Sequence, residues 1–256
     1  MNVVLRAEEN FSNAALGQIV DLNLKRIVQR QRIAHNAPPP NPASLEELVI
    51  PHNYQMCPVG RDNEELFLLY DSGAVNDRIL VFGTERNLDF LQLSDGWYAD
   101  GTFKVAPPLF RQLYTIHGER FGKIIPAIYA LLPNKREETY VRLMDALLGI
   151  RGDLQPLFVM TDFEVAALNM FNDTFPFANL VGCYFHFSQC IFKRTHANGL
   201  SQRYRTDEVF ALQARMIAAL AFVPPDDVVD YFEILENGAG PLPAELRPVL
   251  DYLEDT

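Results

Sequence analysis

Between residues 97 and 196, segments with the period of a strand are followed by segments that alternate strand and helix, and this order restricts the fold most strongly. WYADGTFKV (97–105) alternates apolar and polar residues, which is typical of a strand covered on one side. LFRQLYTIH (109–117) and KIIPAIYALL (123–132) are two further strand candidates, joined by the Gly-bounded loop GERFG (118–122). The first part of this order predicts three antiparallel strands.

The rest of the order completes the fold class. Pro126 weakens the pairing of the third strand, so we expect that strand at an edge of the sheet. An apolar stripe at helical spacing predicts a helix that Asn134 caps and Gly149 ends. Four further segments alternate between the two element types: strand 156–162, which we expect to be buried on both faces, helix 163–171, strand 179–183 and helix 184–196. The order β-β-β-α-β-α-β-α predicts an α/β fold, a mixed five-stranded sheet with flanking helices.

Proline and charge content divide the chain into three parts. Residues 1–44 hold a predicted helix (11–34) and the linker APPPNPAS, whose prolines cannot continue a helix. Residues 45–205 form the compact α/β domain. Residues 206–256 form a mainly helical, acidic tail with a break at Pro224-Pro225.

The composition excludes several classes of protein. Of the 256 residues, 48% are hydrophobic, which excludes general disorder. No run approaches the ~18 apolar residues of a membrane-spanning helix, so we expect no membrane association. Acids near the N-terminus interrupt the apolar run that a signal peptide requires. Three cysteines are too few for a disulfide framework and indicate a reducing compartment.

Charge is unevenly distributed along the chain. The net charge of −11 taken alone argues against nucleic-acid binding, but residues 224–256 carry nine acids and one base. Two stretches are locally basic and are candidate DNA-binding surfaces that face phosphates: Lys25, Arg26, Arg30 and Arg32 in the first, and Lys193, Arg194, Arg203 and Arg205 in the second.

Two aspartates lie where the predicted sheet offers room for a ligand. Asp100 lies on the polar face of the first strand beside Gly101, and the alternative is an aspartate that only faces a turn. Asp162 ends the apolar run 156–162, where α/β sheets bind ligands, and the alternative is an N-cap of the next helix. In a β-β-β-α-β order the first and fourth strands are neighbours, so we expect the two carboxylates side by side.

Such a pair favours a divalent cation. Two like charges about 4 Å apart repel by on the order of 4 kcal/mol at an effective dielectric of about 20, and a cation relieves this repulsion. A hard oxygen site selects Mg²⁺ or Mn²⁺. Two such ions activate a water or a 3′-hydroxyl and stabilise the leaving oxygen in phosphodiester transfer. We therefore expect Asp100 and Asp162 to bind metal and to be catalytic.

Cys183 and His186 form a C-x-x-H pattern where a predicted strand meets a helix, with Cys190 one helical turn beyond. A zinc site needs a second pair of ligands, and His196 is poorly placed to supply one. Nucleophilic catalysis by a Cys–His pair needs an orienting acid at a suitable spacing. The interpretation with fewest requirements is a buried thiol and imidazole that hydrogen-bond neighbouring backbone.

Four segments occur in a distinctive order and spacing: ADGTFKVAPPLFRQLYTIHG (99–118), PAIYALLPNKREETY (126–140), VMTDFEVAALNMF (159–171) and GCYFHFSQCIFK (182–193). Together they resemble the transposase domain of Mutator-like elements (the MULE domain). The resemblance runs from about residue 95 to residue 223 and extends toward residue 45.

The resemblance implies a ribonuclease-H-like fold with a DDE active site for DNA strand cleavage and transfer. By this resemblance Asp100 is the first acid and Asp162 the second, both holding Mg²⁺ or Mn²⁺. Cys183 and His186 match a family C-x-x-H near the site. The implied partner is DNA, namely the terminal repeats of a transposon, in the nucleus, with self-association as an option.

Two parts of the family pattern do not occur in this sequence. Similar proteins carry the third acid, a Glu, in a segment after a helical insertion, and we find no such segment. Many also begin with a zinc-finger domain, and we find no such array of Cys and His. The chain thus resembles a truncated transposase, and whether it is an active enzyme stays open. Three hypotheses remain: a Mutator-like transposase or derivative, a catalytically inactive DNA-binding or regulatory protein, and a fragment that does not fold stably.

Overall fold

The structure, a computed structural model, describes residues 27, 42–60, 63–238 and 242–254. The chain divides into two compact units, residues 1–43 and residues 44–256. The helix predicted over 11–34 lies outside the described residues except for Ile27, which is helical. The second unit carries all elements described here, and none of the described helices is long and apolar enough to cross a membrane.

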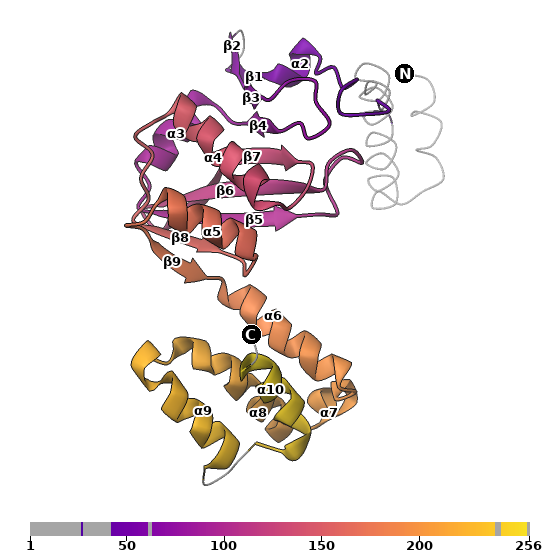
Figure 1. Ribbon diagram of the computed structural model, residues 1–256, viewed down its shortest axis with the longest axis vertical. Coiled ribbons are helices and arrows are strands. Elements are labelled where there is room, and N and C mark those ends of the chain that lie inside the picture. Colours follow the sequence, from indigo (N-terminus) through magenta and orange to yellow (C-terminus); the bar gives the residue numbers. More distant parts are fainter. Residues whose placement is uncertain (1–26, 28–41, 61–62, 239–241, 255–256) are drawn as a thin grey trace, which may run out of the picture. The chain divides into compact units, whose positions relative to one another are not determined.

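A seven-stranded mixed sheet forms the centre of this unit, with the strand order β3-β4-β7-β6-β5-β8-β9 (Figure 1). Its strands are β3 (Leu68–Asp71), β4 (Leu80–Phe82), β5 (Gly96–Thr102), β6 (Gln112–Arg120), β7 (Lys123–Leu132), β8 (Phe158–Thr161) and β9 (Asn179–Gly182). The five predicted strands form the β7-β6-β5-β8-β9 part of it. This arrangement is consistent with a ribonuclease-H-like fold. A helix, α2 (His52–Gln55), and a two-stranded sheet of β1 (Met56–Val59) and β2 (Asn63–Leu66) precede it.

The third predicted strand, β7, lies inside the sheet and not at its edge. It pairs with β6 along its length and with β4 through Tyr129, Ala130 and Leu131. Pro126 precedes the part paired with β4 and lies opposite a register shift in β6 at His117. The edge prediction was therefore wrong for the strand as a whole, because the proline lies where only one side of β7 is paired.

The turn between β6 and β7 is shorter than predicted. Arg120 pairs with Lys123, so the turn consists of Phe121 and Gly122 and not of the five residues 118–122. Both turn residues have positive φ, 53° and 67°. Two positive φ values in a row are typical of the tight hairpin turn whose twist matches that of the flanking strands.

Three helices cover one face of the sheet: α3 (Glu85–Gln92), α4 (Glu137–Ile150) and α5 (Val165–Thr174) (Figure 1). The buried ring of Trp97 joins two of them to β5, since its Nε1 donates to the Leu91 carbonyl at 3.2 Å and its ring meets the edge of Phe175. Tyr114 on β6 contacts Tyr140 on α4, with ring centroids 5.1 Å apart. These aromatic contacts belong to one apolar core under the three helices.

Helix α4 differs from its prediction at both ends. It begins at Glu137 after Arg136, whereas Asn134 lies further upstream. There the Asn134 side chain accepts hydrogen bonds from the Arg136 amide at 2.9 Å and the Thr139 hydroxyl at 2.7 Å. Gly149 lies inside the helix, which continues to Ile150. The apolar stripe thus located the helix but not its boundaries.

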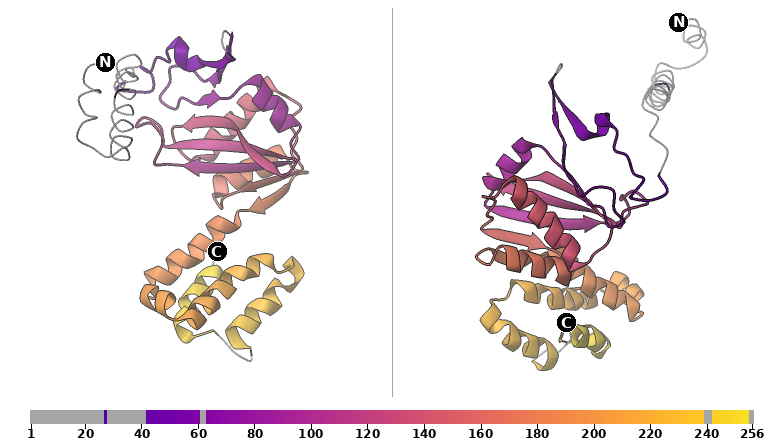
Figure 2. Two further views of the ribbon diagram at one scale, coloured as in Figure 1. Left: turned by 180° about the vertical axis from the view of Figure 1, so that it is seen from behind. Right: turned by 45° about the horizontal axis from the view of Figure 1, so that its top comes forward.

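The opposite face of the sheet is covered only in part (Figure 2). Leu45 packs there with Leu80 and Phe110 in a second, smaller cluster. On β8, Val159 and Thr161 are buried under the helices, but Met160 on this opposite face is only half-buried. The expectation that 156–162 is buried on both faces was therefore wrong, because the described helices cover one face of this strand.

A buried ion pair connects the segment before the sheet to its outer strands. The Arg78 guanidinium is almost fully buried and binds both Asp71 carboxylate oxygens, at 2.7 Å and 2.5 Å. It also donates to the carbonyls of Leu45 and Leu48. This guanidinium holds the pKa of Asp71 below its usual value despite the opposing effect of burial.

A group of helices follows β9 and has a core of its own (Figure 1). Its elements are α6 (Tyr184–Ala197), α7 (Ser201–Thr206), α8 (Glu208–Ala219), α9 (Val228–Asn237) and α10 (Arg247–Glu254), with short 3-10 turns at 220–222, 225–227 and 244–246. Ile191 on α6, Phe210 on α8 and Val249 on α10 are buried together. The predicted break at Pro224-Pro225 separates α8 from α9.

Candidate active site

The directions of the strands bring several loops to one edge of the sheet. Strands β5 and β7 are both antiparallel to β6, so they run in the same direction. Strands β8 and β9 are parallel to β5 and to each other. The carboxyl ends of β5, β7, β8 and β9 therefore lie at the same edge, as does the start of β6. We refer to this end of the strands, which differs from the outer strands of the sheet, as the carboxyl edge.

Asp100 and Asp162 occupy neighbouring positions at the carboxyl edge. Ala99 and Thr161 are paired across the parallel strands β5 and β8, and each aspartate is the next residue along its strand. Thr161 is buried, and the side chain of Asp100 is 48% exposed. One carboxylate at this edge is thus accessible to a ligand.

Asp162 lies in a more buried setting. Burial raises the pKa of its carboxyl, opposed first by a hydrogen bond from the Glu164 amide to Oδ1 at 3.2 Å. The charge of Glu164 adds to the rise, whereas the nearby His186 and Lys135 lower the pKa. Asp162 is not the N-cap of α5, because Glu164 occupies that position. Its environment therefore favours a cation beside it.

His186 approaches Asp100 from the first turn of α6. The amide of Cys183 donates to the Thr161 carbonyl at 2.9 Å, which continues the β8–β9 pairing up to the start of this helix. The Nε2 atom of His186 then lies 3.6 Å from Asp100 Oδ1. Its Nδ1 atom is buried and has no hydrogen-bond partner among the described residues. The expected bond from this imidazole to backbone is absent there, and the side chain lies beside Asp100 instead.

A chain of polar contacts reaches the carboxyl edge from the helix-covered face. Gln112 donates from Nε2 to the Tyr140 hydroxyl at 2.8 Å, and Tyr140 donates to Glu164 Oε1 at 2.8 Å. The other oxygen of Glu164 binds the ammonium group of Lys135. Burial raises the pKa of the Tyr140 hydroxyl well above its usual range, so it remains a donor. This chain fixes the position of Lys135 near Asp162.

Lys135 also takes part in an aromatic cluster at the rim. Its Nζ lies 4.2 Å from the ring centroid of Phe103, and the guanidinium carbon of Arg111 lies 5.9 Å from the same ring. Phe103 follows the end of β5 and is 42% exposed. Two cations and an exposed ring therefore lie next to the aspartate pair.

Sequence reasoning did not single out Glu164, Lys135, Phe103 or Arg111. Strand direction would have found three of them. In three antiparallel strands, the first and the third end on the same side of the sheet, where the second begins. Lys135 follows the third strand, Phe103 follows the first, and Arg111 precedes the second. All three therefore belong to the edge that carries Asp100.

Of the two basic stretches predicted as DNA-binding surfaces, only the second lies within the described residues. Lys25, Arg26, Arg30 and Arg32 lie outside the described residues. In the second stretch, Lys193 is exposed, but the three arginines are engaged within the helical group. Their contacts are Arg194 with the ring of Tyr252, Arg203 with Asp207 and Glu245, and Arg205 with the Ser201 carbonyl.

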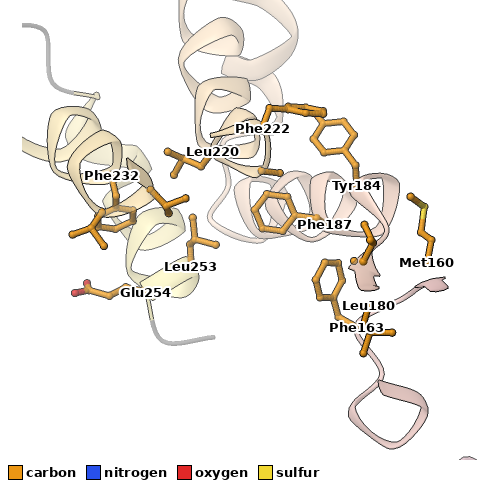
Figure 3. A pocket seen from close by; sticks show the side chains of 15 residues that line it. Met160, Phe163, Leu180, Tyr184, Phe187, Leu220, Phe222, Phe232, Leu253 and Glu254 are labelled. Atoms are coloured by element: carbon orange, nitrogen blue, oxygen red, sulfur yellow. The ribbon is translucent and has the colours of Figure 1, made fainter. Parts of the chain in front are cut away.

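An apolar cavity of about 840 Å³ lies beside the site but has a different character (Figure 3). Met160 and Phe163 line it from the sheet, Phe187 from α6, and Phe222 and Phe232 from the helical group. Glu254 is the charged side chain in its lining. The cavity therefore brings together few groups that can do acid–base or metal chemistry.

The donors at the carboxyl edge suit a divalent cation that shares its coordination with a substrate. Among the described residues, no three His, Cys, Asp or Glu side chains gather closely enough to hold an ion. Mg²⁺ commonly takes one or two protein carboxylates and fills its other positions with water and substrate phosphates. Asp100 and Asp162 fit that requirement, and a cation offsets the cost of ionising the partly buried Asp162.

Comparison with known protein families gives one match. Residues 96–190 match the model of the MULE transposase domain family. The matched region begins at the first residue of β5, ends within α6, and includes Asp100, Asp162, Cys183 and His186. The resemblance expected from the sequence is thus confirmed over these residues. No curated protein matches the chain.

Proposed function

We propose that this chain has a transposase-related role and cleaves DNA strands with the help of a divalent cation, a proposal supported by the match of residues 96–190 to the MULE transposase domain model. Asp100 and Asp162 hold Mg²⁺ or Mn²⁺ in this proposal. The observation that carries it is their position, one residue beyond the paired Ala99 and Thr161 on neighbouring parallel strands. Neighbouring carboxylates are suited to binding such a cation, and this register supports the choice of these two residues.

The residues of the chain have distinct tasks in this proposal. When bound, the cation neutralises phosphate charge and lowers the pKa of a coordinated water. The carboxylates of Asp100 and Asp162 bind and orient it. His186 is a positioning residue, because its Nε2 lies 3.6 Å from Asp100 Oδ1 and restricts where that carboxylate turns. Lys135 adds a positive charge near Asp162 and offsets the repulsion between the carboxylates.

A nicking assay tests the proposal. The full chain is incubated with supercoiled plasmid and a labelled duplex in Mg²⁺ or Mn²⁺, alongside Asp100→Asn and Asp162→Asn. Each substitution is nearly isosteric and removes one anionic ligand, so we expect the cleavage rate to fall at least about 100-fold, more than for the loss of a residue that only supports a ligand. Chelation of the metal should abolish cleavage in the parent chain.

Asp145→Asn is the matched control, because Asp145 is an exposed aspartate on α4. It should cleave like the parent. Robust metal-dependent nicking that survives Asp100→Asn would refute the site assignment. DNA binding by the parent without any cleavage would contradict the proposal and favour the alternative, a catalytically inactive DNA-binding or regulatory protein.

A further inference from the structure

We infer that Phe103, Arg111 and Lys135 form a contact site for an unpaired DNA strand at the rim of the aspartate pair. We call these three residues the rim cluster. The inference rests on the proposed function, since it takes DNA as the substrate, and it adds the element that holds a strand next to Asp100 and Asp162.

The chemistry of the rim cluster matches that of a polynucleotide strand. Binding sites for single strands combine cations that take the phosphates with aromatic rings on which bases stack. Here Lys135 and Arg111 lie 4.2 Å and 5.9 Å from the centroid of the Phe103 ring. The ring is 42% exposed, which leaves it accessible to a base.

Arg111 is available for a phosphate. Its side chain is exposed, and among the described residues its contact is with the Phe103 ring and with no carboxylate. By contrast, Arg203 is paired with Asp207 and Glu245. An exposed guanidinium that is not neutralised by an acid is a good donor to phosphate oxygens.

Lys135 is held in place from behind. Glu164 binds its ammonium group, and Tyr140 and Gln112 in turn fix Glu164. The side chain of Lys135 is 35% exposed, so it is partly accessible to solvent. Glu164 also donates its amide to Asp162 Oδ1 at 3.2 Å, so the pair that it forms with Lys135 lies next to that carboxylate. A phosphate bound by Lys135 therefore lies near the proposed metal site.

The chain offers a matched control for the rim cluster. Arg120 lies over the ring of Phe121, 4.9 Å from its centroid, in the turn between β6 and β7. β6 starts at the carboxyl edge and runs away from it, so the turn that follows β6 lies at the opposite end of the strands. Arg120 and Phe121 thus have the same chemistry without the neighbouring aspartates.

Fluorescence anisotropy on the full chain tests the inference in chelator, so that cleavage does not interfere. The probes are a labelled single strand, a duplex, and a duplex with a single-stranded tail. We expect Phe103→Leu to weaken binding of the single strand and the tailed duplex roughly tenfold and to leave the plain duplex nearly unchanged. Arg111→Gln with Lys135→Gln should reduce the slope of log affinity against log salt by about 1.4 for the single strand.

Arg120→Gln and Phe121→Leu should bind all three probes like the parent. The inference is overturned if the parent binds no DNA, if the rim-cluster variants bind like the parent, or if the control variants weaken binding equally. A melting curve checks that each variant folds. Arg111→Gln alone keeps the test valid if loss of Lys135 unfolds the chain, because Arg111 is exposed.

The same assays separate this inference from the proposed function. Binding that depends on the rim cluster, in a chain that does not cleave DNA in Mg²⁺ or Mn²⁺, would support the inference and refute the proposed function. Cleavage that depends on Asp100, with rim-cluster variants that bind normally, would support the function and refute the inference.

Discussion

Charged side chains in this protein are held by partners from distant parts of the sequence. Arg78 is the clearest case, because its buried guanidinium joins Asp71 to the carbonyls of Leu45 and Leu48. A buried charge that loses its partner is costly, since nothing replaces the lost solvation. The carboxylate of Asp71 therefore matters more for stability than its partial exposure indicates.

Asp71→Asn tests this dependence. At pH 7 we expect the free energy of unfolding to fall by about 3 kcal/mol, the lower part of the range for a broken buried pair. The folded-state pKa of Asp71 is lowered, so its stabilisation is present above the unfolded carboxyl pKa of about 3.9 and is lost as pH falls through the folded value. Urea denaturation at pH 7 and at pH 3 measures both effects.

The pair of Asp77 with Arg142 is the control for that experiment. The side chains of Asp77 and Arg142 are 49% and 34% exposed, so solvent screens the pair and Asp77→Asn should cost less than about 1 kcal/mol. Equal effects of Asp71→Asn at pH 7 and at pH 3 would show that the charge of this carboxyl does not stabilise the fold.

At the scale of elements, periodicity predicted the strands and helices of the sheet region but not their ends. The alternation in 97–105 gave β5 and its buried face with Trp97 and Ala99. Local patterns do not show that another strand, β4, pairs with the part of β7 that follows Pro126. The internal position of β7 was therefore not predictable from them. The length of the loop was not predictable from local patterns either, because Gly118 stays in β6 and only the second glycine, Gly122, lies in the turn, together with Phe121.

Gly122→Ala tests the backbone requirement of this turn. A methyl group at Gly122 meets no atom within 4 Å, so its effect comes from the φ of +67°. We expect the free energy of unfolding to fall by about 1 kcal/mol. Gly149→Ala is the control, since Gly149 lies inside α4 with open space around it, and it should instead stabilise by up to about 1 kcal/mol. A stabilising Gly122→Ala would contradict the turn assignment.

At the scale of the whole second unit, the two largest of its three apolar clusters stabilise the sheet region and the helical group separately. One lies under α3, α4 and α5, and the other joins α6, α8 and α10. The sequence predicted the first from its amphipathic helix and strands. It described the second only as a helical tail, because contacts between residues as far apart as Ile191 and Val249 leave no local pattern.

Phe210→Ala tests whether the second core opens by itself. Phe210 is fully buried there, so the substitution should cost about 3–5 kcal/mol locally. We expect amide hydrogen exchange to accelerate in α7, α8 and α10 while β5 and β6 stay protected. Phe222→Ala, at a ring that is 71% exposed, should leave exchange nearly unchanged. Equal acceleration in β5 would show one cooperative unit.

Patterns in the sequence predicted the two aspartates of the candidate site, and the family resemblance added Cys183 and His186 near it. Asp100 stands out on the polar face of one strand pattern and Asp162 at the end of another, and element order makes their strands neighbours. The placement of His186 next to Asp100 depends on how α6 leaves β9, and the link from Gln112 to Lys135 depends on side-chain packing. Both are tertiary properties that no spacing in the sequence encodes.

Helix α6 has a mechanical consequence. Its first turn carries His186 beside Asp100, and Ile191 on the same rod is anchored among the distal helices. A 14-residue helix is about 21 Å long and bends little, so its two ends move together. A change in the orientation of the helical group relative to the sheet would therefore also change the distance between His186 and Asp100.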